Sequence, residues 1–388
     1  MQLTDYLSPV DGALLASLSD ASPQALIHFT RFYENAMPDL DGVQLAILGV
    51  EEDRFNPAFH GCCKSPDAIR AQFYALLKPK YDLQLADLGN IKAGDSVNDT
   101  LFALSATVAY LLDQKIIPVI LGGTQDLAYA QFSAYQGKRH ALNMVACDAR
   151  IDLKENENNP ALSNYLYKTI SHQPNYLFNL VHMANQNYYI EQESLDAFEK
   201  MNFDLIRLGN LRTKVQEAEP LLRNADLLVM SMNSIRASDA PASAEANPNG
   251  LFGEEACQLM RYAGMANDLS SVGIYDIHAP SDNRERTLKL ASQMLWYFMD
   301  GFYNRRNDYP VADSNDYMKY RTTFQGNQYE IVFYKHLYSE RWWMEVPYPN
   351  ERSKQSGMFL VPCNYNDYQM ALNNEIPDRW MKAYHKLL

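Results

Sequence analysis

The sequence has few of the features that mark secreted, membrane-spanning or zinc-binding proteins. Only five cysteines occur among 388 residues, at positions 62, 63, 147, 257 and 363, and none has C-x-x-C spacing. That number and spacing disfavour both a disulfide framework and a zinc knuckle, so we expect free thiols. The longest apolar runs have the length of a strand, well short of the roughly 18 residues that a membrane-spanning helix needs.

Positive charge is also scarce. The chain has 34 Lys and Arg against 47 Asp and Glu, a formal net charge of −13. Binding to phosphate groups takes concentrated Lys and Arg, and the sequence has no basic stripe, so nucleic acid and membrane are excluded as main partners. The first residues, MQLTDYLSPVDGALLASL, have no positively charged region before the apolar ones and do not resemble a signal peptide. We therefore expect a cytoplasmic protein.

What the sequence does contain is a repeated alternation of short apolar runs and amphipathic stretches. The apolar runs predict strands that are buried on both faces, as in a parallel sheet. They are residues 44–50, 83–89, 116–122, 142–148, 204–210, 226–232 and 271–277. The amphipathic stretches predict helices at residues 65–78, 97–114, 213–224, 254–265 and 284–301. This alternation predicts the α/β class, as a three-layer αβα fold with a mostly parallel, doubly wound sheet.

Composition divides the chain into three parts. They are an N-terminal helical segment at residues 1–42, an α/β domain at residues 43–303 and an aromatic-rich C-terminal extension at residues 304–388. The extension contains the alternating segment NQYEIVFYK, so we expect a strand-containing appendage packed on the main domain. Its expected packing residues are Trp342, Trp343, Tyr348 and Tyr365. The alternative is that these rings line a groove for a ligand.

Polar segments follow three of the predicted strands at the end where an open α/β sheet places its active site. They are LGGTQDLAYA (121–130), CDARIDL (147–153) and SMNSIRASDAP (231–241). In an extended chain the spacing of Asp148, Arg150 and Asp152 puts all three side chains on one side, which suits the binding of a hard cation by carboxylates. Taken alone, the pattern also fits two solvated acids at the end of a strand.

In order and spacing these segments resemble the arginase, agmatinase and formimidoylglutamase family, whose signatures are G-G-D-H, D-A-H-x-D and S-x-D-x-D-x-x-D-P. The segments GCCKSPDAIR (61–70), LADLGNI (85–91) and GIYDIHAP (273–280) extend the resemblance over residues 43–303. It implies an arginase-like fold and a homo-oligomer. In such enzymes two manganese ions bridge a hydroxide that attacks a guanidino or formimino carbon.

Four of the six metal ligands implied by the resemblance are absent here. Gln125 and Arg150 stand at the two histidine positions. Asn233 and Ile235 stand at the positions of two aspartates, and the later aspartate of the third motif is Ser238. Asp148 and Asp152 match ligand positions, and Asp276 matches a late acidic residue.

Arg150 decides how this loss is interpreted. A guanidinium a few ångströms from a divalent ion repels it by several kcal/mol even at an effective dielectric constant near 20. We therefore expect no metal cofactor, with Arg150 lying between Asp148 and Asp152 and donating to both carboxylates. The alternative is a single Mn or Mg ion bound by Asp148, Asp152, Asn233 and Asp239.

Two loops extend from this edge of the sheet, at residues 156–164 and 236–257, and we expect them to roof a pocket. The candidate ligand-binding residues are Gln125, Asp148, Arg150, Asp152, Asn233, Arg236 and Asp276. A small acidic or amide-bearing ligand suits Arg150, Asn233 and Arg236. Alternatively, the loops pack against a neighbouring subunit.

Two functions remain open from the sequence. The favoured one is a pseudoenzyme, a non-catalytic protein of this family that binds a small polar ligand or a protein partner. The alternative is a diverged hydrolase with one metal or none. It would cleave a linear amidine, formimino or guanidino C–N bond and not a peptide bond.

Overall fold

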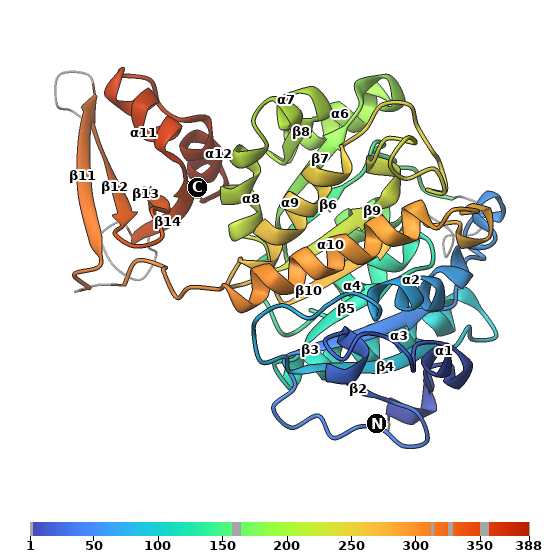
Figure 1. The fold of residues 1–388 in the computed structure, drawn as a ribbon. Coiled ribbons are helices and arrows are strands. Elements are labelled where there is room, and N and C mark those ends of the chain that lie inside the picture. Colours follow the sequence, from blue (N-terminus) through green and yellow to red (C-terminus); the bar gives the residue numbers. More distant parts are fainter. Residues whose placement is uncertain (1–2, 157–163, 312–313, 325–328, 350–356, 388) are drawn as a thin grey trace.

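The computed structural model describes residues 3–156, 164–311, 314–324, 329–349 and 357–387. A large α/β domain has a central sheet between two helical layers, and a smaller unit with its own antiparallel sheet stands beside it (Figure 1). The chain passes from one to the other after the long helix α10. Within the described residues, no helix has the length and apolar character needed to cross a membrane.

The central sheet has ten strands in the order β1-β4-β3-β5-β10-β9-β6-β7-β8, with β2 also paired to β4. All pairs are parallel except β1 with β4. The strands are β1 (Leu7–Ser8), β2 (Thr30–Phe32), β3 (Leu45–Val50), β4 (Leu85–Ile91), β5 (Ile117–Leu121), β6 (Leu142–Cys147), β7 (Leu177–Asn185), β8 (Asp204–Arg207), β9 (Leu227–Ser231) and β10 (Ser271–Tyr275). The predicted mostly parallel sheet is confirmed.

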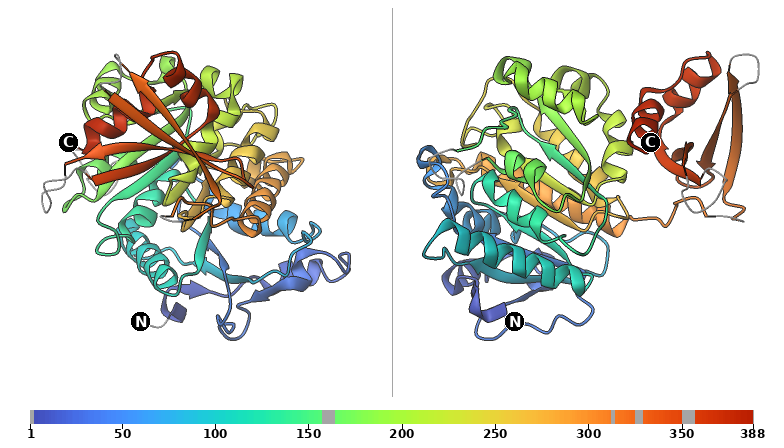
Figure 2. Two further views of the ribbon diagram at one scale, coloured as in Figure 1. Left: turned by 90° about the vertical axis from the view of Figure 1, so that its left-hand side faces the viewer. Right: turned by 180° about the vertical axis from the view of Figure 1, so that it is seen from behind.

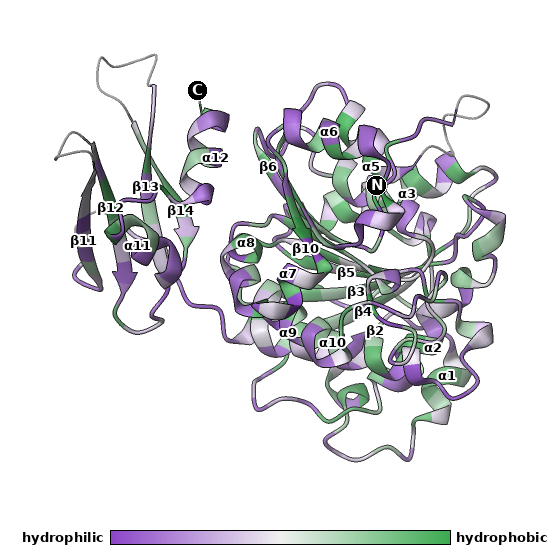
Figure 3. Ribbon diagram, turned by 90° about the horizontal axis from the view of Figure 1, so that it is seen from above, coloured by the Kyte–Doolittle hydropathy of each residue, from purple (hydrophilic) through white to green (hydrophobic). Residues whose placement is uncertain are grey.

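Helices cover both faces of this sheet, as the uniformly apolar strands predict (Figure 2). One face packs against α2 (Ser65–Phe73), α7 (Leu208–Thr213), α8 (Glu219–Arg223), α9 (Gly253–Gly264) and α10 (Arg286–Tyr303). The other packs against α3 (Val97–Asp113), α4 (Ala128–Ser133), α5 (Tyr165–Ser171) and α6 (Gln192–Lys200). Along β5, Val119 belongs to the first core cluster and Ile120 to the second, which is the alternation expected of a strand buried on both faces. Viewed from above, hydrophobic strands lie between the helical layers (Figure 3).

The strand predicted at residues 204–210 is too long, and the helix predicted after it is not continuous. The strand ends at Arg207, opposite the last residue of β7, and Leu208 already begins α7. A strand at the edge of the sheet has a partner on one side only, so its ladder stops where that partner stops. The helix predicted at residues 213–224 is broken, because Lys214 has non-helical backbone angles and Pro220 is tolerated only in the first turn of α8.

The N-terminal segment is helical only in part, which corrects the sequence-based expectation. It contains one α-helix, α1 (Gly12–Ser17), and the strands β1 and β2, both of which pair with β4. The local sequence hid these strands because they have only two and three residues. The segment therefore extends the central sheet.

Strand β7 was missed because its sequence, LFNLVHMAN, has polar residues among apolar ones. Two of them, His182 and Asn185, are nevertheless buried. By strict geometry neither ring nitrogen of His182 has a hydrogen-bond partner within the described part of the chain, and the backbone of Arg150 favours the imidazolium less than burial disfavours it. Burial disfavours the charged imidazolium and lowers the pKa of His182 to about 3.

The C-terminal unit is a four-stranded antiparallel sheet in the order β11-β12-β13-β14, with two helices on one face (Figure 2). Its elements are β11 (Tyr317–Phe324), β12 (Tyr329–His336), β13 (Trp342–Tyr348), β14 (Gly357–Cys363), α11 (Tyr365–Leu372) and α12 (Asp378–Leu387). Trp342 and Trp343 are buried, as expected for packing residues, and Tyr348 is half-buried. Tyr365 does not act as a core residue, because 53% of it is exposed at the start of α11.

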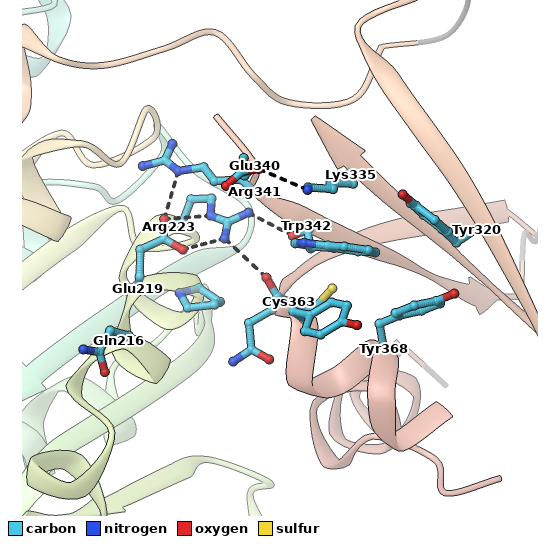
Figure 4. Close-up of a pocket in the computed structure, with 13 residues that line it drawn as sticks. Gln216, Glu219, Arg223, Tyr320, Lys335, Glu340, Arg341, Trp342, Cys363 and Tyr368 are labelled. Carbon is cyan, nitrogen blue, oxygen red and sulfur yellow. Dashed lines mark hydrogen bonds and ion pairs between the residues drawn. The ribbon is translucent and has the colours of Figure 1, made fainter. Parts of the chain in front are cut away.

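A network of charged side chains joins this unit to the α/β domain. The carboxylate of Glu219 in α8 pairs with Arg223 at 2.5 Å and with Arg341 at 3.0 Å. Arg223 also donates to the backbone carbonyl of Trp342 at 2.9 Å (Figure 4). Arg341 pairs in addition with Asp308 at 3.2 Å. Two carboxylates, Glu219 and Asp308, thus balance two nearly buried guanidinium groups that hold the two parts together.

His182 makes the stability of the fold sensitive to acid. Between pH values of about 6.5 and 3, the unfolded chain binds a proton that the folded chain does not, so the free energy of unfolding falls as the pH falls. We expect His182→Leu to gain about 2–3 kcal/mol relative to the unmodified protein when the pH changes from about 7 to about 4.5. Urea denaturation at both pH values measures this difference. A difference between the two proteins that does not change with pH would contradict the assignment.

The junction network yields a second prediction. Glu219→Gln leaves Arg223 and Arg341 without their shared carboxylate, so the free energy of unfolding should fall by about 3 kcal/mol, as for other broken buried ion pairs. Proteolysis of the connection after α10 should become faster. The control is Glu330→Gln, which breaks an ion pair with Arg321 that is exposed on both sides and should cost at most about 1 kcal/mol. Equal losses in the two variants would show that the network does not hold the junction.

Candidate functional site

A cavity of about 240 Å³ lies where the carboxyl ends of β5, β6, β9 and β10 meet. Parallel strands bring these ends to one edge of the sheet, which is where ligands bind in open α/β folds. The cavity is lined by Phe55, Asn56, Phe59, Gln125, Asp126, Asp148, Arg150, Asp152, Asn164, Tyr165, Leu166, Asn233, Glu245 and Asp276. The structure therefore brings together six of the seven predicted ligand-binding residues.

Asp276, directly after β10, accepts hydrogen bonds from three residues at the floor of the cavity. Its Oδ1 accepts a hydrogen bond from the backbone N–H of Gln125 at 2.8 Å. Its Oδ2 accepts from the hydroxyl of Ser231 at 2.6 Å and from the side-chain amide of Asn233 at 3.4 Å. The backbone φ of 67° lies in the left-handed region, which residues other than glycine occupy at a cost in free energy. Burial raises the pKa of Asp276 to about 7.

Two further carboxylates lie close to this floor. Asp148 Oδ1 accepts from its neighbour Ala149 N–H at 2.6 Å and more weakly from Arg150 N–H at 3.4 Å. Burial raises the pKa of Asp148 well above its usual value, and the carboxylate of Asp276 raises it further. Burial also raises the pKa of Asp126, to about 6. The cavity therefore concentrates acidic groups in a place that water solvates poorly, where burial favours their uncharged forms.

Arg150 does not bridge Asp148 and Asp152, and that prediction is wrong. Its Nε donates to Glu245 Oε2 at 2.5 Å, and its guanidinium lies 4.3 Å from the ring centre of Tyr189. The cause is the path of the chain after β6, which leaves Asp148 buried and Asp152 exposed, although both line the cavity. Residues at i, i+2 and i+4 share one side only within a strand, and β6 ends at Cys147, before these residues.

The two amides at former ligand positions are used in internal hydrogen bonds. Gln125 donates from Nε2 to the hydroxyl of Tyr165 at 3.1 Å. Asn233 Oδ1 accepts from the backbone N–H of Glu245 at 2.7 Å. Ile235 is fully buried in the apolar core. These side chains stabilise the loops around the cavity.

Arg236 lies outside this cavity, which corrects the seventh predicted residue. Its guanidinium lies 3.9 Å from the ring centre of Phe252 and pairs with Asp239 at 2.9 Å, in a separate cavity next to α9 and α10. After β9 the chain leaves the edge of the sheet, and Arg236 forms a β-bridge with Asn247. The alternative metal site is therefore wrong in its use of Asp239.

The loop at residues 236–257 does contribute to the wall of the cavity, through Glu245. Most of the second predicted loop, residues 157–163, lies outside the described residues. Its last residue, Asn164, lines the cavity and caps α5 by accepting from Leu166 N–H at 2.9 Å.

The donors present do not fit a pair of divalent ions. Both oxygens of Asp276 already accept hydrogen bonds, as does the side-chain oxygen of Asn233. Where the resemblance places imidazoles, Gln125 offers an amide and Arg150 a cation that cannot coordinate a metal. Across the residues that the structure describes, no group of three or more His, Cys, Asp or Glu side chains is arranged to hold a metal ion.

Sequence reasoning missed two residues that shape the site, Glu245 and Tyr165. Glu245 lies 95 positions after its partner Arg150, so no local motif connects them. Tyr165 begins α5, after the segment that lies outside the described residues. The only signal for either was their position in or beside long polar loops at the carboxyl edge of the sheet.

Comparison with curated proteins finds formimidoylglutamases. The enzyme of Staphylococcus haemolyticus is 22% identical over 306 residues, which cover 72% of this chain and 95% of that protein. The enzyme of Bacillus subtilis is 20% identical over 275 residues, covering 66% of this chain and 86% of that protein.

Solved structures with the same fold carry the same names. Trypanosoma cruzi formiminoglutamase, crystallised with Mn2+, has a TM-score of 0.64 at 18% identity, covering 75% of this chain and 99% of that one. Bacillus subtilis formimidoylglutamase has a TM-score of 0.62 at 18% identity, covering 68% and 88%. The model of the arginase family matches residues 43–300, which is more than half of the sequence. This chain belongs to the arginase family.

Proposed function

We propose that this chain is a non-catalytic member of its family that binds a small organic cation in the acidic cavity, without a metal. An amidinium, guanidinium or primary ammonium group is the chemistry that the cavity suits. The observation that carries the proposal is the charge of the lining, where five carboxylates face one guanidinium among the described residues.

Electrostatics support a cationic ligand. Asp126, Asp148 and Asp276 all have raised pKa values because burial disfavours their charged forms. A bound cation would offset this cost by favouring the charged carboxylates, in a site where charges are weakly screened. The pair formed by Arg150 and Glu245 is an example within the chain of a guanidinium held by an acid of this cavity.

The same charge argues against the acidic ligand expected from the sequence. That expectation relied on Arg150, Asn233 and Arg236 facing one pocket. Arg236 lies elsewhere, Arg150 is neutralised by Glu245, and the oxygen of Asn233 is already engaged. An anion would meet carboxylates without a free cationic partner, which costs free energy in a poorly solvated cavity.

The loss of most of the implied metal ligands supports a protein without catalytic activity. In the relatives' family a pair of metal ions generates the nucleophile, and this chain keeps two of the six implied ligands, Asp148 and Asp152. The rival is a diverged hydrolase of an amidine, formimino or guanidino bond with one metal or none, which the names of the relatives favour. The cytoplasmic location and the homo-oligomeric state remain predictions.

Metal removal and addition separate the two functions. We expect EDTA to leave the melting temperature unchanged and Mn2+ not to raise it, because a ligand that binds only the folded state would stabilise it. We also expect no urea from L-arginine and no formamide from N-formimidoyl-L-glutamate. Calorimetric melting and product assays measure these quantities. A melting temperature that falls with EDTA and recovers with Mn2+, or metal-dependent product release, would establish the rival hydrolase.

Ligand binding tests the acidic cavity directly. We expect agmatine or L-arginine to bind by isothermal titration calorimetry and glutarate not to bind. Asp148→Asn removes a buried acid that a bound cation would hold in its charged form, so the affinity for the cation should fall at least about tenfold. The matched control is Asp239→Asn on the neighbouring loop, outside the cavity, which should retain the affinity. If both variants bind equally well, the cation does not occupy this cavity.

A further inference from the structure

A second cavity, of about 630 Å³, lies at the junction between the α/β domain and the C-terminal unit. One wall comes from α8 and the turn before it, with Gln216 and Pro220. The other comes from β11, β12, β13 and the start of α11 (Figure 4). This junction cavity and the acidic cavity share no lining residue.

Aromatic rings form much of the second wall. Trp342, Tyr320 and Tyr368 pack against one another, with ring centres 5.1 to 5.3 Å apart. Tyr365 extends this cluster, 5.7 Å from Trp342, and is 53% exposed. Trp342 is buried and Tyr320 and Tyr368 are half-buried, so Tyr365 is the exposed ring of this cluster. Covering an exposed aromatic ring beside a cavity with a ligand is favourable.

The charges of the cavity are balanced within the protein. Glu219 pairs with Arg223 and Arg341, and Arg341 also pairs with Asp308. Lys335 pairs with Glu340 at 3.2 Å. Because each cation already has an acid, neither an anionic nor a cationic ligand would find an uncompensated charge here.

What remains available is a set of neutral hydrogen-bonding groups. Within the described part of the chain, the hydroxyls of Tyr365 and Tyr368, the side-chain amide of Gln216 and the Nδ2 of Asn364 have no hydrogen-bond partner. They combine donors and acceptors around an aromatic surface. A matching ligand is uncharged, has an apolar face and carries several groups that both donate and accept.

We infer that this junction cavity binds a neutral saccharide. One face of a pyranose ring presents C–H bonds that pack on the electron-rich face of an aromatic ring, while its hydroxyls donate to and accept from phenol and amide groups. A heterocyclic base fits less well, since Trp342, Tyr320 and Tyr368 already pack against one another and a base could not be held between two of their rings. A nucleotide would also lack a free cation for its phosphate.

Titration of the full chain tests the inference. The probes are methyl α-D-glucopyranoside, methyl β-D-galactopyranoside and N-acetyl-D-glucosamine, and the readouts are tryptophan fluorescence and calorimetry. We expect at least one probe to bind, with Tyr365→Ala and Gln216→Ala each weakening that binding about tenfold or more. The matched control is Tyr338→Ala, which removes another exposed tyrosine of the C-terminal unit, 72% exposed and outside the cavity.

Three outcomes would overturn the assignment: no probe binds, the two cavity variants bind as well as the control, or adenosine or choline competes with the saccharide. Tyr365 and Gln216 do not belong to the apolar core, so their loss should not unfold the chain, and melting curves check this. Asp148→Asn should leave saccharide binding unchanged. Failure here therefore does not affect the proposed function of the acidic cavity, and the reverse also holds.

Discussion

The carboxylate of Asp276 is the interaction on which the candidate site depends. A buried carboxylate is costly unless hydrogen bonds satisfy it, and this one accepts from the loops after β5 and β9. These bonds hold three strand ends together at a residue with a left-handed backbone. Because neutral donors of the protein supply them, the floor of the cavity is built without any bound cation.

The residues that stand at the implied metal-ligand positions are also satisfied by groups of the protein. Gln125, Arg150 and Asn233 each found an internal partner, respectively Tyr165, Glu245 and the backbone of Glu245. Glu245 therefore serves two of them, and it connects the loop after β9 to the loop after β6. A group that is polar and partly buried costs free energy when unpaired, so the replacements keep the edge of the sheet closed.

The fold followed from the sequence where burial was uniform and failed where it was mixed. Runs such as residues 116–122 are apolar on both faces, so they could be identified as central strands. β7 has the same surroundings but includes His182 and Asn185, whose burial depends on contacts distant in the chain. The order of the site residues around the strand ends was also predictable. The partner of Arg150 was not, since an ion pair over 95 positions leaves no local pattern.

The two cavities differ in whether the charges of their lining residues are balanced, so they suit different ligands. At the junction, Glu219 and Asp308 together offset the charges of Arg223 and Arg341, so mainly neutral groups and aromatic rings remain for a ligand. At the edge of the sheet, five acids and one guanidinium line the cavity among the described residues, and burial, followed by repulsion from neighbouring acids, raises the pKa of Asp148 and of Asp276. An ion is favoured only where it compensates an existing charge. The two proposed ligands differ accordingly, an organic cation at the edge of the sheet and an uncharged molecule at the junction.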